Sequence, residues 1–224
     1  MNENKIHYSP PTRPWVSTIY EDAALVICDK PSGLLSVPGR PEHHKDCLLD
    51  RLREIFGEMY IVHRLDMATS GLIVYARTKP AQAALGRQFE QRQVDKIYEA
   101  RIFGHPKDDA GHIDFPLIKD WPNRPKQKIC HETGKPSLTR WRVQRRFEQN
   151  GIPFTDVTLL PETGRSHQLR VHMHAIGHPI LGDELYGTEE SLSSSPRLLL
   201  HASKLTLTHP ESGEKIVTHS EKPF

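Results

Sequence analysis

The sequence predicts an α+β domain with a mixed, mainly antiparallel central sheet and flanking helices and loops. Strand-like segments outnumber helical ones along the 224 residues, and their order is irregular rather than a strict alternation of strand and helix. Such an order favours a mixed or antiparallel sheet over repeated βαβ units. The chain is long enough to bury a stable core, and it contains no internal repeat or low-complexity segment.

The composition indicates a cytoplasmic protein and leaves its ligand open. The formal net charge is only +2, which neither requires nor excludes a nucleic-acid partner. Cys28, Cys47 and Cys130 are widely spaced without a CxxC pair, as is typical of reduced thiols in the cytosol. The N-terminus lacks an apolar signal segment, and no apolar run approaches the roughly 20 residues of a membrane span.

The N-terminal part is predicted to hold an arm and several short strands. Residues 1–14 contain three prolines among polar residues, which indicates an extended arm. Residues 16–20 and 24–28 have the composition of strands, and the strand pattern resumes at residues 34–37.

Helices and strands alternate in the next part of the chain. Leucine and isoleucine recur at helical spacing over residues 46–57, where a glycine ends the pattern. The continuous apolar run at residues 72–76 predicts a buried strand. A second helix is expected after Pro80, followed by a strand over residues 94–103.

The remaining elements are mostly strands. A third helix is expected over residues 166–176, where Gly177 and Pro179 stop it. The strands are expected at residues 113–118, 138–143, 154–160, 198–200, 204–208 and 215–218.

Residues 61–71 form the segment with the most polar chemistry. This stretch brings one acid, two basic groups and two hydroxyls into a non-periodic segment between a helix and a buried strand. Polar loops held between packed elements commonly carry function. Asp66 is therefore the first candidate for a catalytic group.

Metal binding is one alternative, because His167, His172, His174 and His178 lie close together in the sequence. On a helix, His172 and His174 point about 200° apart and cannot chelate one ion together. The sequence also lacks an HExxH motif or a cysteine partner. We therefore expect no metal.

Cofactor and serine chemistry have even less support. The glycines match neither GxxxxGK[ST] nor GxGxxG, so no nucleotide cofactor is expected. Ser70 has no GxSxG elbow around it. The hydroxyls of Thr69 and Ser70 are expected to bond local loop amides.

Two basic segments differ in their predicted roles. Residues 121–128 combine Arg124, Lys126 and Lys128 with a tryptophan in a proline-stiffened loop, which favours RNA. Residues 140–146 alternate cations with one tryptophan, and here we favour a solvated charged face around a core tryptophan.

The start of the third predicted helix also carries cations. Ser166 and Thr163 are equal candidates for its N-cap. Arg165 and Arg170 oppose the helix macrodipole, so they are placed for an external or catalytic anion. Pairing with a surface carboxylate is the alternative for both arginines.

Several short motifs follow one another in a fixed order. His63-Arg64-Leu65-Asp66 precedes Thr69-Ser70-Gly71, and further motifs occupy residues 30–35, 96–100, 164–172, 177–183 and 197–202. Together they resemble the motifs of the RluA family of pseudouridine synthases over nearly the whole chain from Trp15. The resemblance implies the pseudouridine synthase fold and an isomerase that needs no cofactor.

The resemblance also implies a domain organisation and partners. Residues 15–224 would form the catalytic domain, without the separate S4-type RNA-binding domain of larger relatives. The shortness of the chain and the loop at residues 120–128 are similar to members that modify a tRNA anticodon stem-loop and 23S rRNA. Stem-loops of those two RNAs are therefore the expected partners of a monomer with no obligate protein partner.

The family assigns roles to the residues in these motifs. Asp66 would be the catalytic carboxylate, Arg170 its cationic partner, and Tyr98 would lie against the uracil ring. Arg64 would fill the space that a flipped uridine leaves, and His63 would contact the RNA backbone. Leu200 would form an apolar wall of the pocket.

Two other classes of function are consistent with parts of the sequence. A non-catalytic RNA-binding or RNA-chaperone module would use the same basic surface without modifying RNA. A metal-dependent hydrolase would lose activity in EDTA and regain it with zinc.

Overall fold

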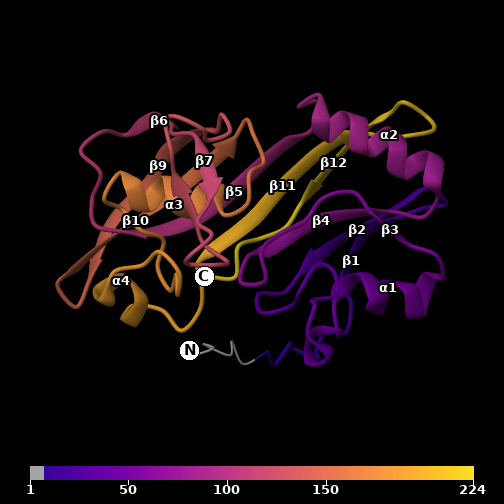
Figure 1. Ribbon diagram of the computed structural model, residues 1–224, viewed down its shortest axis with the longest axis horizontal. Coiled ribbons are helices and arrows are strands. Elements are labelled where there is room, and N and C mark those ends of the chain that lie inside the picture. The colour runs from indigo at the N-terminus through magenta and orange to yellow at the C-terminus, as the bar shows by residue number, and fades with distance from the viewer. Residues whose placement is uncertain (1–7) are drawn as a thin grey trace.

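The structure is a computed structural model that describes residues 8–224, and its main element is a ten-stranded sheet (Figure 1). The strands of this sheet are β1 (Thr18–Glu21), β2 (Leu25–Lys30), β3 (Tyr60–Ile61), β4 (Ser70–Ala76), β5 (Asp95–Phe103), β6 (Ala110–Asp114), β9 (Leu138–Gln149), β10 (Ile152–Pro161), β11 (Leu200–Thr208) and β12 (Lys215–His219). A separate two-stranded sheet consists of β7 (Leu117–Lys119) and β8 (Gln127–Ile129). The helices are η1 (Glu42–His44, a 3-10 turn), α1 (Leu48–Phe56), α2 (Lys79–Glu90), α3 (Gln168–Ala175) and α4 (Glu189–Ser193).

The strand order places β11 at the junction of the two halves of the molecule. The order is β1-β2-β4-β11-β5-β10-β9-β6, with β12 beside β11 and β3 beside β4. In Figure 1, β11 runs between the N-terminal strands on one side and the later strands on the other. Within residues 8–224, β4 and β11 form the only parallel pair, with Ser70 opposite His201 and Gly71 opposite Ala202. The predicted mixed, mainly antiparallel α+β fold is confirmed.

Two helices cover opposite faces of the N-terminal half of the sheet. Alternate residues of a strand point to opposite faces, so Val26 and Cys28 pack with α1 while Leu25 and Ile27 pack with α2. β4 is buried along its whole length, as its continuous apolar run predicts. Helix α2 begins at Thr78, whose side chain accepts a hydrogen bond from the Ala81 amide.

Helix α3 covers the C-terminal half. Leu169 and Met173, which are one helical turn apart, pack into a buried cluster with residues of β5, β9 and β10. Trp141 belongs to this cluster, as predicted for the core tryptophan of residues 140–146. Its charged neighbours face outward, and Arg140 pairs with Glu162 at 2.6 Å. The predicted solvated face is therefore confirmed for this strand.

Some predicted elements are wrong in detail. Residues 34–37 form a loop, although Leu34 is fully buried, because burial alone does not supply a strand partner. The predicted strand at 113–118 is broken at Phe115-Pro116 into β6 and β7, since proline interrupts strand pairing. The two strands expected at 198–200 and 204–208 are largely one strand, β11, which has an irregular register between Ala202 and Lys204. The short elements β3, β8 and α4 were not predicted.

The beginning of the chain packs on α1 as far as the structure describes it. Residues 1–7 of the predicted arm lie outside the described residues, and residues 8–14 contain no helix or strand. Tyr8 donates a hydrogen bond to the Asp46 carbonyl at 2.7 Å, and buried Arg51 donates to the carbonyls of Pro11 and Trp15. No helix in residues 8–224 has the length and apolar character needed to cross a membrane.

Candidate active site

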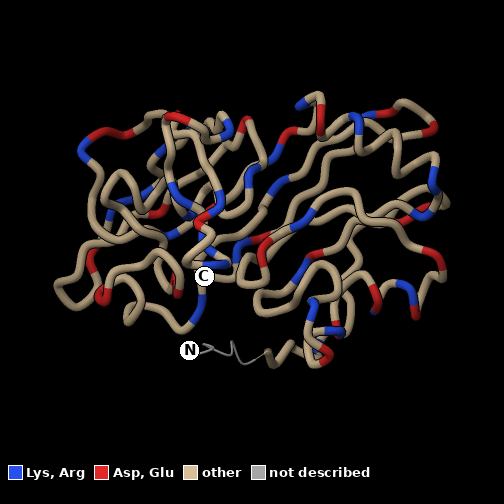
Figure 2. The backbone as a smooth tube through the Cα atoms, viewed as in Figure 1, with Lys and Arg blue, Asp and Glu red and all other residues tan. Residues whose placement is uncertain are grey.

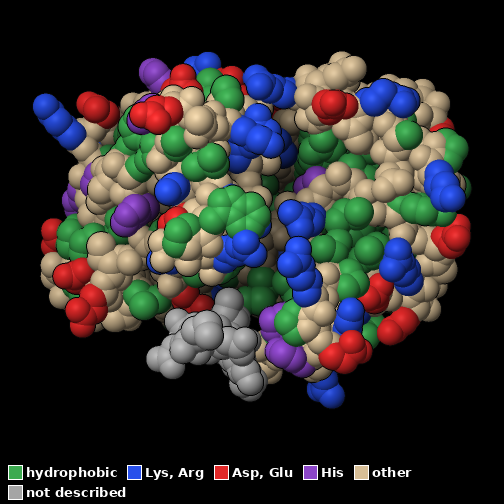
Figure 3. Space-filling model, in the orientation of Figure 1, with side chains coloured by type: hydrophobic (Ala, Val, Ile, Leu, Met, Phe, Trp, Pro, Cys, Tyr) green, Lys and Arg blue, Asp and Glu red, His purple; other side chains and the backbone are tan. Residues whose placement is uncertain are grey.

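A cavity of about 1200 Å³ lies where the two halves of the sheet meet. Its walls come from the loops after β2 and β3, from β5, from the start of α3 and from the segment before β11. Figure 3 shows a hollow in the middle of the molecule, with Lys and Arg side chains along its borders. The charged residues that line the cavity are the cations Lys30, Arg64, Lys96, Arg165, Arg170 and Arg197, and the acids Asp29, Asp66, Glu184 and Glu221. Figure 2 shows cationic positions from both halves near this junction.

The loop between β3 and β4 presents Asp66 to the cavity and is held on both sides of that residue. Ser36 donates to the Leu65 carbonyl at 2.8 Å and accepts from the Leu65 amide at 3.2 Å. Ser32 donates to the Ala68 carbonyl at 2.7 Å. These bonds fix the backbone before and after Asp66, so the position of its carboxylate depends on the residues 30–36 that precede it in the sequence.

Lys30 also supports the loop between β3 and β4. It is fully buried, and its ammonium donates to the carbonyls of Pro31, Leu34 and Met67 at 2.9, 2.7 and 3.1 Å. Burial lowers the pKa of Lys30 to about 7, although nearby Asp66 favours the charged form. Three carbonyl acceptors compensate part of the cost of burying this cation.

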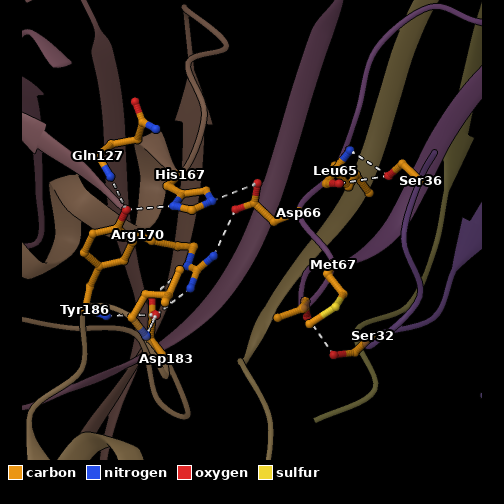
Figure 4. A network of polar contacts seen from close by, with 12 residues as sticks. Ser32, Ser36, Leu65, Asp66, Met67, Gln127, His167, Arg170, Asp183 and Tyr186 are labelled. Atoms are coloured by element: carbon orange, nitrogen blue, oxygen red, sulfur yellow. Dashed lines mark hydrogen bonds and ion pairs between the residues drawn. The ribbon is translucent and has the colours of Figure 1, made fainter. Parts of the chain in front are cut away.

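Arg170 joins Asp66 to a second carboxylate, Asp183 (Figure 4). Its Nη1 donates to Asp66 Oδ2 at 3.2 Å, and its Nε and Nη2 donate to the two oxygens of Asp183 at 2.8 and 2.7 Å. Asp183 also accepts hydrogen bonds from the amides of Leu185 and Tyr186. Burial disfavours the charge of Arg170, but Asp183 first and Asp66 second outweigh it and raise the Arg170 pKa. The guanidinium therefore stays charged and fixed beside Asp66.

His167 approaches the other oxygen of Asp66. The distance from His167 Nε2 to Asp66 Oδ1 is 3.8 Å, and His167 Nδ1 lies 2.7 Å from the Tyr186 hydroxyl. Burial lowers the pKa of His167, and this effect outweighs the opposite influence of Asp66. The ring therefore favours its neutral form in the folded protein.

Tyr98 and Leu200 form an apolar part of the cavity wall. Leu200 is buried, and Tyr98 packs between two core clusters while its ring borders the cavity. Burial, with a further contribution from Asp66, raises the Tyr98 pKa. The phenol is therefore neutral at physiological pH. Its hydroxyl has no hydrogen-bond partner among residues 8–224 in the structure.

The two basic residues before Asp66 are placed differently. His63 is turned inward, where Nε2 accepts a hydrogen bond from the Val74 amide at 3.1 Å and the ring stacks on Phe89. Its Nδ1 has no hydrogen-bond partner among residues 8–224. Arg64 is exposed at the cavity and makes no side-chain hydrogen bond or ion pair with any described residue of the chain.

The remaining predicted RNA contacts lie at the rim. Arg165 is exposed and donates to the Pro136 carbonyl at 3.2 Å. In the 121–128 loop, the Arg124 guanidinium lies 3.9 Å from the centre of the exposed Trp121 ring. Lys126 is partly buried, and Lys128 is exposed with Asp120 3.9 Å away. Pro125 of this loop lines the cavity.

The N-cap residue of α3 is neither of the two predicted candidates. Neither Ser166 nor Thr163 caps the helix, because His167 occupies the N-cap position in a left-handed conformation with φ of 55°. The Gln168 side chain instead bonds the residues that precede the helix. Its Oε1 accepts hydrogen bonds from Thr163 Oγ1 and from the Arg165 amide. This tight turn is what directs His167 toward Asp66.

The helix histidines do not form a metal cluster. His172 is buried and has hydrogen-bond partners in the Thr139 hydroxyl and the Phe115 carbonyl, while His174 is exposed. Within residues 8–224, no three His, Cys, Asp or Glu side chains are grouped so that they would hold a metal ion.

Comparison with known proteins identifies the family of this chain. A sequence model described as RNA pseudouridylate synthase matches residues 24–175, which include Asp66, Tyr98 and Arg170. The chain belongs to the RNA pseudouridylate synthase family. As a pseudouridine synthase it is an isomerase that modifies RNA.

Several relatives of this pseudouridine synthase are similar over most of their length. The chain is 56% identical over 209 residues to the dual-specificity RNA pseudouridine synthase RluA of Vibrio vulnificus (strain CMCP6), covering 92% of this chain and 83% of the relative. It is 51% identical over 218 residues to the protein of the same name from Escherichia coli (strain K12), covering 97% and 98%. Among solved structures, human RNA pseudouridylate synthase domain containing 1 has a TM-score of 0.78 and 31% identity, covering 93% of this chain and 84% of that one.

Sequence reasoning assigned no role to several residues that complete the site. No separate function was predicted for four residues: Asp183, Lys30, His167 and Tyr186. The first three nevertheless lie within motifs that resemble those of the family. A buried arginine needs a buried acidic partner. The acid after Gly182, Asp183, was therefore an available candidate for the partner of Arg170. Nothing in the local sequence pairs Tyr186 with His167.

Proposed function

We propose that this pseudouridine synthase isomerises specific uridines in two kinds of RNA, the anticodon stem-loop of tRNA and a stem-loop of 23S rRNA. The support is its 51–56% identity to relatives whose names state a dual specificity for RNA. The cationic rim of the cavity suits an RNA backbone, because cations replace the counterions that phosphates otherwise hold. We also propose that the protein acts as a monomer in the cytoplasm, where these RNAs are used.

The reaction exchanges one bond for another within the same nucleotide. The N1–C1′ glycosidic bond breaks, the detached uracil turns, and C5 joins C1′ while its proton is lost and N1 gains one. No electron is gained or lost overall, and no atom enters or leaves apart from exchanged protons. The site must therefore hold the base, stabilise charge and move protons.

Asp66 is proposed as the catalytic carboxylate, acting as nucleophile at C1′ or as base at the 2′ carbon. The observation that carries this proposal is the contact of Arg170 Nη1 with Asp66 Oδ2 at 3.2 Å inside the cavity. A charge-assisted hydrogen bond from a guanidinium fixes the direction of a carboxylate. Arg170 is proposed as this positioning cation, in agreement with its ion pair to Asp183.

Tyr98 and Leu200 are proposed to hold the base. A flat ring beside an apolar side chain suits one unstacked uracil, and recognition of single bases by aromatic rings is common in RNA-binding proteins. The Tyr98 hydroxyl is proposed to help remove the C5 proton, directly or through a water molecule. Its neutral phenol would first accept a hydrogen bond or relay a proton rather than act as a fixed anion.

The cations around the cavity are proposed to bind and open the RNA. Arg64 is exposed and unpaired among the described residues, so its guanidinium is available to occupy the place of the flipped uridine. His63 Nδ1, Arg165 and the loop cations Arg124, Lys126 and Lys128 are proposed to contact the RNA backbone. Flipping costs a few kcal/mol and costs less in a loop than in a duplex.

The test of this function uses RNA labelled with tritium at C5 of uridine. Wild type is expected to release tritium from a tRNA anticodon stem-loop and from 23S rRNA fragments, and Asp66→Asn is expected to release none while still binding. Near-normal release by Asp66→Asn would contradict the assignment of the carboxylate. Mapping pseudouridine in tRNA and rRNA from cells with and without this gene would identify both substrates.

A further inference from the structure

We propose that His167 and Tyr186 are positioning residues for the Asp66 carboxylate, and that they link it to the β7–β8 hairpin. This proposal rests on the proposed catalytic role of Asp66. Four groups lie in a chain in Figure 4: the Gln127 amide in β8, the Tyr186 hydroxyl, the His167 ring and the Asp66 carboxylate. None of the first three is among the residues proposed to react with, hold or open the RNA.

The hydrogen bonds of Tyr186 fix the tautomer of His167. The Tyr186 oxygen accepts from the Gln127 amide at 2.7 Å, and among residues 8–224 the only acceptor near its own proton is His167 Nδ1, also at 2.7 Å. If His167 Nδ1 carried the proton instead, the Tyr186 proton would have no acceptor among residues 8–224 in the structure. Since a neutral imidazole has one protonated nitrogen, the proton of His167 is on Nε2.

The position of Asp66 independently favours the same tautomer. Nε2 lies 3.8 Å from Asp66 Oδ1, so an Nε2–H bond dipole attracts the carboxylate, whereas a bare Nε2 lone pair would repel it. The distance is too long for a hydrogen bond, and the interaction is electrostatic. A proton therefore lies between the imidazole and the carboxylate.

The two oxygens of Asp66 thus have different neighbours. Oδ2 accepts from Arg170, and Oδ1 faces His167. A carboxylate that is attracted at both oxygens cannot rotate freely about its Cβ–Cγ bond. Fixing that rotation determines which lone pair reaches the ribose, and reacting groups must be held within a few tenths of an ångström for an efficient step.

The same chain connects the site to the basic loop. Tyr186 is buried against Leu117 of β7 and Ile129 of β8, and Gln127 directly follows the 121–126 part of the loop. Helix α3 also contributes Val171 to this cluster. RNA that binds the exposed Trp121 and Arg124 therefore contacts an element that is hydrogen-bonded to the neighbour of the catalytic carboxylate.

The first test separates the two nitrogens of His167 by substitution. Asn tolerates the left-handed backbone of position 167 and reaches only as far as Nδ1, whereas Gln extends an amide to the position of Nε2. His167→Gln is therefore expected to keep more turnover than His167→Asn, which should lose about tenfold or more in kcat with nearly unchanged KM. A purely structural role predicts the reverse order, because Asn suits this backbone better. His174→Gln, on the exposed part of the same helix, serves as the matched control.

The second test uses Tyr186→Phe, which keeps the buried ring and removes only the hydroxyl. We expect kcat to fall about tenfold, in line with loss of one buried hydrogen bond to the positioning residue His167, with RNA affinity unchanged. An unchanged kcat would overturn the proposed link through Tyr186.

The third test measures the tautomer without any reaction. ¹⁵N–¹H correlation spectra of histidine-labelled protein at pH 7.5 should show His167, assigned by its absence in His167→Asn, as the Nε2–H tautomer. Tyr186→Phe should convert it to a mixture. A wild-type ring protonated on Nδ1 would overturn the proposal. If wild type isomerises no uridine at all, the proposed function fails, and the spectra still decide the tautomer.

Discussion

Arg170 offers Asp66 only one of its nitrogens, Nη1 at 3.2 Å, and uses Nε and Nη2 to bind Asp183 at 2.8 and 2.7 Å. The better geometry belongs to the carboxylate that is almost fully buried, whereas Asp66 keeps a side chain that is 25% exposed. Asp183 therefore anchors the guanidinium, and Asp66 receives a fixed cation while remaining free to contact a substrate.

Arg170→Lys is expected to lower kcat by a factor of about 100 or more with a smaller change in RNA affinity. Lysine keeps the charge but cannot bind Asp183 with two parallel hydrogen bonds and also reach Asp66 in a defined direction. Single-turnover rates on an anticodon stem-loop would measure the effect. Arg101→Lys is the matched control, because Arg101 makes a similar two-nitrogen contact with Asp156 and does not line the cavity. Equal losses in both variants would contradict a specific role of Arg170.

Arg64→Ala is expected to change the free energy of unfolding by less than about 0.5 kcal/mol, because the side chain is exposed and has no partner among the described residues. Its kcat/KM on a structured stem-loop should fall about tenfold or more. The loss should be smaller on a short unstructured RNA, where no stacked base has to be replaced. Arg87→Ala, at an exposed position of α2 away from the cavity, should behave as wild type on both RNAs.

Tyr98→Phe is expected to separate the ring from the hydroxyl. The ring that is proposed to pack against the uracil is kept, so RNA affinity should stay within about threefold of wild type, while turnover should fall at least about tenfold because the proposed proton relay is lost. Tyr98→Leu should weaken both. Equilibrium binding and tritium release measure the two effects, and an unchanged rate in Tyr98→Phe would limit Tyr98 to packing.

His63 should make stability depend on pH. Burial, with a smaller contribution from Lys96, lowers the pKa of His63 to about 3, against 6.5 for an ordinary histidine. Between these values the unfolded chain binds a proton that the folded chain does not, so the free energy of unfolding falls as the pH falls. Relative to His63→Gln, wild type should lose about 1 kcal/mol between pH 7.5 and 5.5 in urea denaturation. A difference in stability between wild type and His63→Gln that does not change with pH would disprove the predicted titration.

Gly71→Ala is expected to destabilise the protein by more than about 2 kcal/mol. Gly71 has φ of 109°, and a methyl group there would lie 2.4 Å from the Ala202 carbonyl oxygen on the parallel neighbour β11. Gly86→Ala in α2 is the control, because nothing lies within 4 Å of its added methyl and alanine favours a helix. It should be neutral or stabilising by up to about 1 kcal/mol. Thermal unfolding of both variants gives the comparison, and equal effects would contradict the close approach.

The sequence predicted the elements that bury a regular apolar pattern. Helix α1, the buried strand β4 and the third helix were found because periodicity reports directly on burial. Residues 34–37 have the same apolar character but pack as a loop, and β3 and β8 are too short to show any period. The apolar pattern of a short segment does not indicate which strand will pair with it.

The polar loop and the start of the third helix pointed to Asp66 and Arg170 as candidates, but their pairing and roles were predictable only through the motifs. Their contact spans 104 positions of sequence. Asp183 and Tyr186 depend on how two later turns fold back onto α3, which no spacing rule describes. The inward turn of His63 toward Val74 was also missed, because a histidine in a polar loop gives no local sign of which way it faces.

The place of β11 between β4 and β5 has a consequence for synthesis on the ribosome. β4 carries the loop of Asp66 and β5 carries Tyr98, yet these strands share no neighbour until residues 200–208 exist. A nascent chain that already contains Asp66, Tyr98 and Arg170 still lacks β11, the strand that joins its two halves. The cavity between the two halves therefore cannot be complete before residues 200–208 have been synthesised.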